Sequence, residues 1–238
     1  MAISRRLMMT ASLGALVGCS RTASVPSGLE STRLASVSGQ PATAVTLLRH
    51  GESIASAQGI LSTVKPGLGL TERGRAEARR AAAVLAVRGY DAVVSSPLTR
   101  ATETAAALAE VTGNEVVVLD GLAEISAGSY EGRSTSEYGT DFLAYVDAWT
   151  RGALDYRIPG GESGHEFMAR LDASMAQILA AGRRNVLAVS HGEAIRAWAS
   201  NRLLDPAAEN VKLGYNGFLV LRAEPDGWQL TEASPDGP

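Results

Sequence analysis

The residue pattern with the clearest capacity for chemistry occurs twice in this chain. His50 follows an apolar segment (residues 44–48) and Arg49, and His191 follows a second apolar segment (residues 185–189). A neutral imidazole can act as a nucleophile or exchange protons, and arginine binds phosphate or carboxylate groups through paired hydrogen bonds. Two histidines and an arginine in this context indicate nucleophilic or acid–base chemistry on an anionic substrate.

The two apolar segments are expected to be strands that bring these histidines together. Each is short, contains β-branched residues and is bounded by polar residues, as is typical of a buried strand in a parallel sheet. The histidines then lie at the carboxyl ends of the strands, where open α/β sheets bind ligands. Two histidines in matching positions are stronger evidence for a site than either histidine alone.

Arg100 is a further candidate because of its position at the start of an expected helix. Ser96 is predicted as the N-cap and Pro97 as the first helical residue, directly after an expected strand at residues 91–95. A cation in the first turn opposes the helix dipole, which costs roughly 0.3–1 kcal/mol. Local rules are broken in this way at functional sites, so we interpret Arg100 as an anion-binding residue.

The remaining chain predicts strands that alternate with helices, which is typical of an α/β domain with a largely parallel sheet. Residues 53–70 are expected to be irregular, because they contain glycines and a Pro-Gly pair. Residues 115–119 predict another strand, and residues 217–223 and 227–232 predict a terminal hairpin. Helices are expected at residues 71–89, 134–150 and 163–182 and after His191.

Four motifs in this order resemble the histidine phosphatase superfamily, also called phosphoglycerate mutase-like. They are Arg49-His50-Gly51-Glu52, a Ser-x-x-x-Arg-Ala-x-x-Thr pattern around Arg100, a Leu-x-Glu…Gly-x-aromatic-Glu-Gly loop around Glu124, and His191-Gly192. The similarity extends over about residues 44–232. It implies a three-layer α/β fold in which helices flank a mostly parallel central sheet.

The resemblance also implies a role for each matching residue. His50 would be the nucleophile that forms a phosphohistidine, and Glu124 would be the proton donor. Arg49, Arg100 and His191 would bind the phosphoryl group, so that no metal or other cofactor is required. Further contacts to substrate would come from Ser56, Gln58, Gly59 and Gly192.

Two residues depart from the family pattern. Ser56 stands where the family often has asparagine, and Glu193 stands where the family often has the second glycine of His-Gly-Gly. Neither change removes a catalytic group. Glu193 adds negative charge near the site, which we expect to weaken the binding of highly anionic substrates.

Three alternatives to phosphomonoester hydrolysis remain open. The first is a phosphoglycerate-type mutase, although mutases of this family resemble one another in a long basic insertion, and residues 131–159 are short and hold only three arginines. The second is a metallohydrolase that uses His50, His191, Glu52 and Glu193, although no His-x-His spacing is present. The third is a non-catalytic surface lipoprotein that binds a phosphorylated ligand.

The amino-terminal residues predict export and lipid anchoring. Residues 1–19 contain two arginines and a short apolar segment that ends in Leu16-Val17-Gly18-Cys19, which resembles a bacterial lipobox. Cys19 is the only cysteine in the chain, so its lipidation explains an otherwise unpaired thiol. Residues 20–43 are rich in small and polar residues and predict a flexible tether. We therefore expect a domain (residues 44–238) anchored on the extracytoplasmic face of the cell membrane.

Composition limits the possible partners. The chain has 238 residues, a hydrophobic content of 45% and a formal net charge of −3, values that are ordinary for a globular protein. It contains no basic stripe, so nucleic acid is not expected as a partner. A small phosphorylated substrate would instead be held by a local cluster of cationic side chains.

Overall fold

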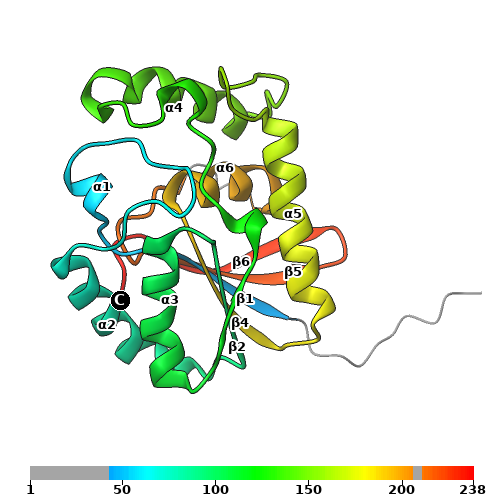
Figure 1. Ribbon diagram of the computed structural model, residues 1–238. Coiled ribbons are helices and arrows are strands. Elements are labelled where there is room, and N and C mark those ends of the chain that lie inside the picture. Colours follow the sequence, from blue (N-terminus) through cyan, green and yellow to red (C-terminus); the bar gives the residue numbers. More distant parts are fainter. Residues whose placement is uncertain (1–42, 206–210) are drawn as a thin grey trace, which may run out of the picture. The chain divides into compact units, whose positions relative to one another are not determined.

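The computed structural model describes residues 43–205 and 211–238 (Figure 1). The predicted signal segment, Cys19 and all but the last residue of the predicted tether lie outside the described residues. The described chain forms one six-stranded sheet in the order β3-β2-β4-β1-β5-β6. The strands are β1 (Ala44–Arg49), β2 (Ala92–Ser95), β3 (Val116–Val118), β4 (Asn185–Ser190), β5 (Phe218–Glu224) and β6 (Gly227–Ser234).

The sheet is mixed, and its parallel part holds the candidate residues. Strands β1, β4, β2 and β3 pair in parallel, whereas β5 pairs antiparallel with both β1 and β6 at one edge. The predicted mostly parallel sheet and the predicted terminal hairpin are therefore both confirmed. In β1 and β4, Arg49 is the register partner of Ser190. Because these two strands are adjacent and run in the same direction, His50 and His191 lie next to each other at the carboxyl ends of β1 and β4.

Helices cover both faces of the sheet, which gives three layers (Figure 1). On one face, Leu48 packs in a core with residues of α2 and α3, and on the other face Leu47 packs with residues of α4, α5 and α6. Alternate residues of β1 thus enter two separate cores, as expected for a strand buried on both sides. The helices are α1 (Ile54–Ala57), α2 (Glu72–Leu85), α3 (Thr99–Thr112), α4 (Thr135–Thr150), α5 (Gly164–Ala180) and α6 (Gly192–Arg202).

The helix starts follow the sequence rules in most places. Thr71 caps α2 by accepting a hydrogen bond from the Gly74 amide. Ser163 and Glu166 form a reciprocal capping box at the start of α5. None of the described helices combines the length and the apolar character that crossing a membrane requires.

Two local predictions were wrong. The stretch expected to be irregular contains the short helix α1, which Ser53 caps through its hydroxyl. Helix α3 begins at Thr99 with Leu98 as its N-cap, so Ser96 is not the cap and Pro97 is not the first helical residue. The Ser96 hydroxyl lies 2.7 Å from His191 Nε2 instead. A tertiary contact with a histidine 95 residues away has overridden a local preference.

Candidate active site

The predicted histidines and Arg100 lie together in a buried cluster. The rings of His50 and His191 are 5.0 Å apart and meet edge to face. The Arg100 Nε atom donates to His50 Nε2 at 3.0 Å. All three side chains are buried, and each belongs to a segment that follows the carboxyl end of a parallel strand: β1, β4 or β2. The expectation that these strand ends meet is confirmed.

The contacts of His50 fix which ring nitrogen carries the proton. Nδ1 lies 2.6 Å from the Gly51 carbonyl oxygen, which can only accept, so Nδ1 is the protonated nitrogen. Nε2 therefore keeps its lone pair. Burial, followed by the charges of Arg100 and Arg49, holds the pKa of His50 well below its ordinary value. The imidazole is neutral at physiological pH, and its Nε2 can act as a nucleophile.

His191 is neutral as well, but its contacts suit a hydrogen-bond donor. The Ser96 hydroxyl oxygen accepts from the Leu98 amide at 3.3 Å, and we assign its own proton to the contact with His191 Nε2, 2.7 Å away. The proton of His191 then resides on Nδ1. Burial, followed by the charge of Arg100, lowers the pKa of His191 well below its ordinary value. His191 thus presents an N–H group without carrying a positive charge.

Three buried donors in this cluster have no hydrogen-bond partner within the described parts of the chain. They are Arg49 Nε, Arg100 Nη1 and His191 Nδ1. A buried donor without a partner costs free energy, and such groups are stabilised by an acceptor. A tetrahedral oxyanion such as phosphate offers several acceptor oxygens to donors grouped in this way. The cluster is therefore built to bind an anion next to His50 Nε2.

Arg49 is held in place from three sides. Its Nη1 atom donates to the Leu213 carbonyl, and its guanidinium lies 4.6 Å from the ring centroid of Tyr215. A Cβ atom added at Gly192 would stand 3.1 Å from Arg49 Nε. Gly192 therefore leaves room for Arg49, because a side chain there would press on the arginine that faces the anion, and its contact to substrate stays a prediction.

Glu124 lines the mouth of the cluster, in a cavity of about 420 Å³ that Arg49 and His50 also line. Its Oε1 atom accepts hydrogen bonds from the amides of Ile125 and Ala194, both at 2.9 Å. The hydrogen bonds that the described residues make to this carboxyl all go to Oε1, so Oε2 can carry a proton. Burial raises the pKa of Glu124, and the nearby charge of Glu193 raises it further. The carboxyl is therefore suited to donate a proton.

The other predicted substrate-binding residues differ in their placement. Ser56 lines the cavity. Gly59 does not belong to the described residues that line the cavity, although its carbonyl accepts from the amide of Thr135, which does. Gln58 is exposed, and it does not belong to the described residues that line the cavity.

The metallohydrolase alternative depends on Glu52 and Glu193. Glu52 accepts a hydrogen bond from the Thr71 hydroxyl at 2.8 Å, and Glu193 accepts from Arg196 at 2.7 Å. Among the residues that the structure describes, no group of three or more His, Cys, Asp or Glu side chains is arranged to hold a metal ion. The alternative therefore lacks a ligand set in this part of the chain.

Comparison with known proteins identifies the family. A profile of the histidine phosphatase superfamily (branch 1) matches residues 45–234. The chain belongs to this superfamily. The match covers the six strands except for the first residue of β1, and it includes every residue of the cluster, so the predicted family is confirmed.

Relatives of this histidine phosphatase include a mutase and a phosphatase. It is 31% identical to a probable phosphoglycerate mutase of Enterobacter sp. (strain 638) over 76% of this chain and 84% of that protein. It is 29% identical to a PE-PGRS family protein of Mycobacterium tuberculosis over 82% of this chain, which spans only 37% of that protein. The solved structure of a mycobacterial glucosyl-3-phosphoglycerate phosphatase superposes with a TM-score of 0.68 at 28% identity, covering 82% of this chain and all of that one.

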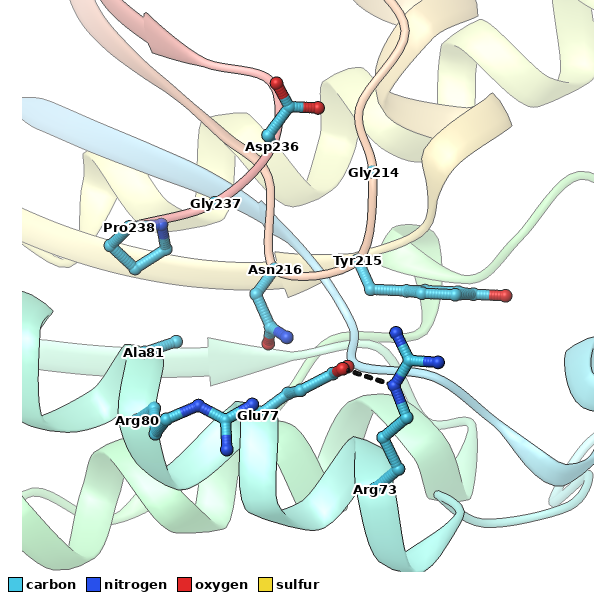
Figure 2. A pocket seen from close by; sticks show the side chains of 10 residues that line it. All are labelled: Arg73, Glu77, Arg80, Ala81, Gly214, Tyr215, Asn216, Asp236, Gly237 and Pro238. Atoms are coloured by element: carbon cyan, nitrogen blue, oxygen red, sulfur yellow. Dashed lines mark hydrogen bonds and ion pairs between the residues drawn. The ribbon is translucent and has the colours of Figure 1, made fainter.

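Sequence reasoning missed several residues that shape the site of this histidine phosphatase. The Tyr215 ring stacks on the Arg49 guanidinium. Tyr215 also lines a second cavity of about 380 Å³ (Figure 2). Arg73 and Glu77, which line the same cavity, are joined by a hydrogen bond of 2.7 Å from Arg73 to Glu77. No periodic pattern marks Tyr215, because it lies in a loop. Glu131 binds the Thr63 amide and hydroxyl and so holds part of the cavity wall. Glu131 is the second glutamate of the loop motif around Glu124, and this position was the one sequence feature that could have indicated its role.

Proposed function

We propose that this enzyme hydrolyses phosphomonoesters and carries the phosphoryl group on His50 Nε2 during turnover. The observation that supports the proposal best is a neutral His50 whose unprotonated Nε2 lies beside three unpartnered buried donors. A phosphohistidine mechanism is typical of the superfamily. No step requires a metal ion, because Arg49 and Arg100 supply the positive charge.

In the first step, His50 Nε2 attacks phosphorus and the P–O bond to the leaving alcohol breaks. Arg100 Nε, which occupies the Nε2 lone pair in the free enzyme, transfers its hydrogen bond to a phosphoryl oxygen. Arg49, Arg100 and His191 then match the charge spread over the transferring group. Glu124 gives its proton to the leaving oxygen, so a neutral alcohol departs.

In the second step, the Glu124 carboxylate accepts a proton from water as the water oxygen attacks phosphorus. The bond between phosphorus and Nε2 breaks, inorganic phosphate is released, and His50 and Glu124 return to their starting states. One carboxyl group acts first as acid and then as base. The two steps replace one difficult displacement, as in other covalent mechanisms.

The charge around the cavity favours hydrolysis of monophosphates over a mutase reaction. Arg49 is the only lysine or arginine among the described residues that line the cavity, and Glu193 contributes a carboxylate there. A mutase must hold a second anionic group of its substrate, for which this lining offers no further cation. We therefore propose substrates with an uncharged leaving group, although relatives of both classes exist.

The proposal predicts that the purified protein releases one inorganic phosphate per alcohol from glycerol phosphate. Its kcat/KM for glycerol phosphate should exceed that for 3-phosphoglycerate by about 10-fold or more, since like charges in a partly desolvated site repel by between about 1 and 4 kcal/mol at 4 Å and about 1.4 kcal/mol is tenfold. Phosphate release and isomerisation of 3-phosphoglycerate are assayed side by side.

The matched control for this prediction is Glu193→Gln, which removes the charge and keeps the size of the side chain. In this variant the ratio of kcat/KM for glycerol phosphate to kcat/KM for 3-phosphoglycerate should be smaller than in the wild-type protein. The kcat/KM for p-nitrophenyl phosphate should change little. Isomerisation faster than phosphate release would instead make the enzyme a mutase. Absence of turnover with every phosphomonoester would favour the non-catalytic binding protein.

We also propose that the enzyme is exported and anchored to a membrane through a lipid on Cys19. The support is the apolar segment that ends in Leu16-Val17-Gly18-Cys19 and the absence of any other cysteine from the sequence. A coil of the length of residues 20–43 reaches on the order of 25 Å. That reach would hold the catalytic domain clear of a membrane surface.

Cys19→Ala is expected to move the protein from the membrane fraction to a soluble fraction, because the acyl chains would have no attachment site. Fractionation and incorporation of labelled fatty acid measure the change. Ser20→Ala is the matched control and should remain in the membrane fraction. Unchanged fractionation of Cys19→Ala would exclude the lipobox.

A further inference from the structure

The residue proposed as the proton donor lies on a loop, so its position depends on what holds that loop. Glu124 follows β3 and a short 3-10 turn (Asp120–Leu122), a second 3-10 turn begins at Gly128, and the next α-helix begins only at Thr135. Neither a strand nor a helix therefore fixes the Glu124 backbone. Loop residues need such support when a catalytic group must be held within a fraction of an ångström.

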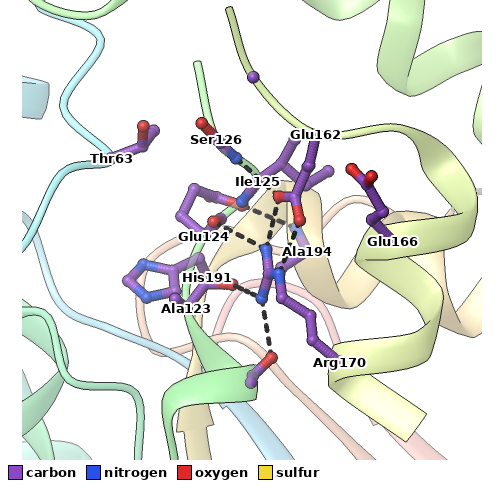
Figure 3. A network of polar contacts seen from close by, with 12 residues as sticks. Thr63, Ala123, Glu124, Ile125, Ser126, Glu162, Glu166, Arg170, His191 and Ala194 are labelled. Carbon is purple, nitrogen blue, oxygen red and sulfur yellow. Dashed lines mark hydrogen bonds and ion pairs between the residues drawn. The ribbon is translucent and has the colours of Figure 1, made fainter. Parts of the chain in front are cut away.

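Arg170, on α5, uses every donor that it has, and three of its five hydrogen bonds go to the backbone around Glu124. A guanidinium carries five N–H groups, and Arg170 makes five hydrogen bonds of 2.8–3.0 Å (Figure 3). Three of these hydrogen bonds go to the backbone carbonyls of Gly121, Ala123 and Glu124. The other two go to the Glu162 carboxylate.

Glu162 extends the same support to the far side of Glu124. Its Oε1 atom accepts from the Ser126 amide at 2.9 Å as well as from Arg170. The pair thus binds the backbone on both sides of the proton donor. Both side chains are largely buried, with exposures of 24% for Arg170 and 14% for Glu162, so water does not readily replace these contacts.

We propose that Arg170 and Glu162 are positioning residues that set Glu124 for proton transfer to the leaving group. This role rests on the proposed function of Glu124 as the acid. Arg170 Nη2 holds the Glu124 carbonyl at 3.0 Å, and the Ala194 amide holds the carboxyl oxygen Oε1. Both ends of the residue are thereby fixed. Neither Arg170 nor Glu162 is among the described residues that line the cavity, so neither is a catalytic residue.

This role predicts a loss of activity that depends on the leaving group. A poor leaving group such as an alkoxide needs the proton from Glu124, whereas p-nitrophenolate departs with little help. The ratio kcat/KM reports steps up to the first irreversible one, here formation of the phosphoenzyme. It therefore excludes the later hydrolysis step, in which Glu124 serves every substrate alike.

The experiment compares kcat/KM for glycerol phosphate and p-nitrophenyl phosphate in the full-length protein and its Arg170→Lys variant. Lysine keeps the charge, but its three donors on one nitrogen cannot reproduce the planar set of five contacts. We expect kcat/KM to fall about 30- to 100-fold for glycerol phosphate, as for a misplacement of about 1 Å, and less than about 3-fold for p-nitrophenyl phosphate.

Two other variants keep this test decisive. Glu162→Gln should also lower kcat/KM for glycerol phosphate more than for p-nitrophenyl phosphate, but by a smaller factor. This variant replaces Arg170→Lys in the test if Arg170→Lys does not fold. Arg202→Lys is the matched control, because Arg202 binds Asp172 of the same helix α5 through two nitrogens without any bond to the loop. Arg202→Lys should change kcat/KM for both substrates by the same factor or leave both unchanged.

An equal loss for both substrates in Arg170→Lys and Glu162→Gln, or no loss, would show that the pair is only structural and overturn the proposal. The Glu124→Gln variant shows whether such a result contradicts only the positioning role of Arg170 and Glu162 or also the proposed role of Glu124 as the acid. If Glu124→Gln itself slows both substrates equally, Glu124 is not the acid, and both proposals fall. Selective loss in Glu124→Gln without selective loss in the other two variants overturns the positioning role alone.

Discussion

Replacing His50 with alanine is expected to abolish turnover and to leave no phosphate covalently bound to the protein. The neutral ring, its proton on Nδ1 and its lone pair on Nε2 all follow from the Gly51 contact and from burial. Alanine removes the imidazole that we propose as the nucleophile beside the three unpartnered donors. The loss in kcat should be on the order of 10⁴- to 10⁶-fold, as when the nucleophile of another covalent enzyme is removed.

Rapid quench with a labelled phosphomonoester measures the intermediate directly. The wild-type protein should trap label that is stable in base and labile in acid, as expected for a phosphorylated imidazole. His165→Ala is the matched control, because the His165 side chain is exposed and is hydrogen-bonded to the Asp155 carboxylate at 2.9 Å, away from the cluster. It should trap label and turn over substrate normally.

Two outcomes would contradict the phosphohistidine mechanism. Turnover that survives His50→Ala would show that another group attacks phosphorus. Turnover that a chelator abolishes would return the metallohydrolase to consideration. Either result would leave the family assignment intact, because the assignment rests on the profile match and not on the chemistry.

The parallel strands and their terminal histidines could be predicted because their signals are local. An apolar segment that ends in Arg-His-Gly carries its own evidence for a buried strand and for a polar strand end. The pairing of β1 with β4 then brings His50 to His191 through backbone register alone. Nothing about distant side chains was needed for that step.

The acid and its support could not be derived in this way. Taken alone, Glu124 has the signature of a surface carboxylate, and only the family motif indicated its role. Its carboxyl is held by a hydrogen bond from the amide of Ala194 of α6, which is 70 residues away. Arg170 reaches the loop across 46 to 49 residues, and Arg49 reaches Leu213 across 164. Such contacts depend on how whole helices pack, which the spacing of residues does not record.

Arg100→Ala is expected to lower kcat/KM by about 10³-fold or more, the amount that an arginine contributes to charge stabilisation in other phosphoryl transfers. Its Nη1 atom is a buried donor without a described partner, and its Nε atom reaches the nucleophile. Removing its charge also removes one cause of the lowered pKa of His50. In the variant, the pKa of His50 should therefore move back toward its ordinary value, which a titration followed by NMR measures.

The same substitution should barely change the melting temperature. A buried cation with an unsatisfied N–H group costs desolvation free energy, and burial accordingly lowers the pKa of Arg100. Losing that cost offsets the loss of packing. Arg196→Ala is the contrasting control, because Arg196 is equally buried but forms ion pairs with Glu193 and Asp147.

Arg196→Ala should therefore lower the melting temperature more than Arg100→Ala does, since it leaves two carboxylates without their cation. Arg100→Lys should recover only part of the lost activity, because an ammonium group keeps the charge without the planar, paired donors. A large drop in the melting temperature of Arg100→Ala with activity retained would make Arg100 a structural residue. In that case the unpartnered donors of Arg49 and His191 alone would have to account for phosphate binding.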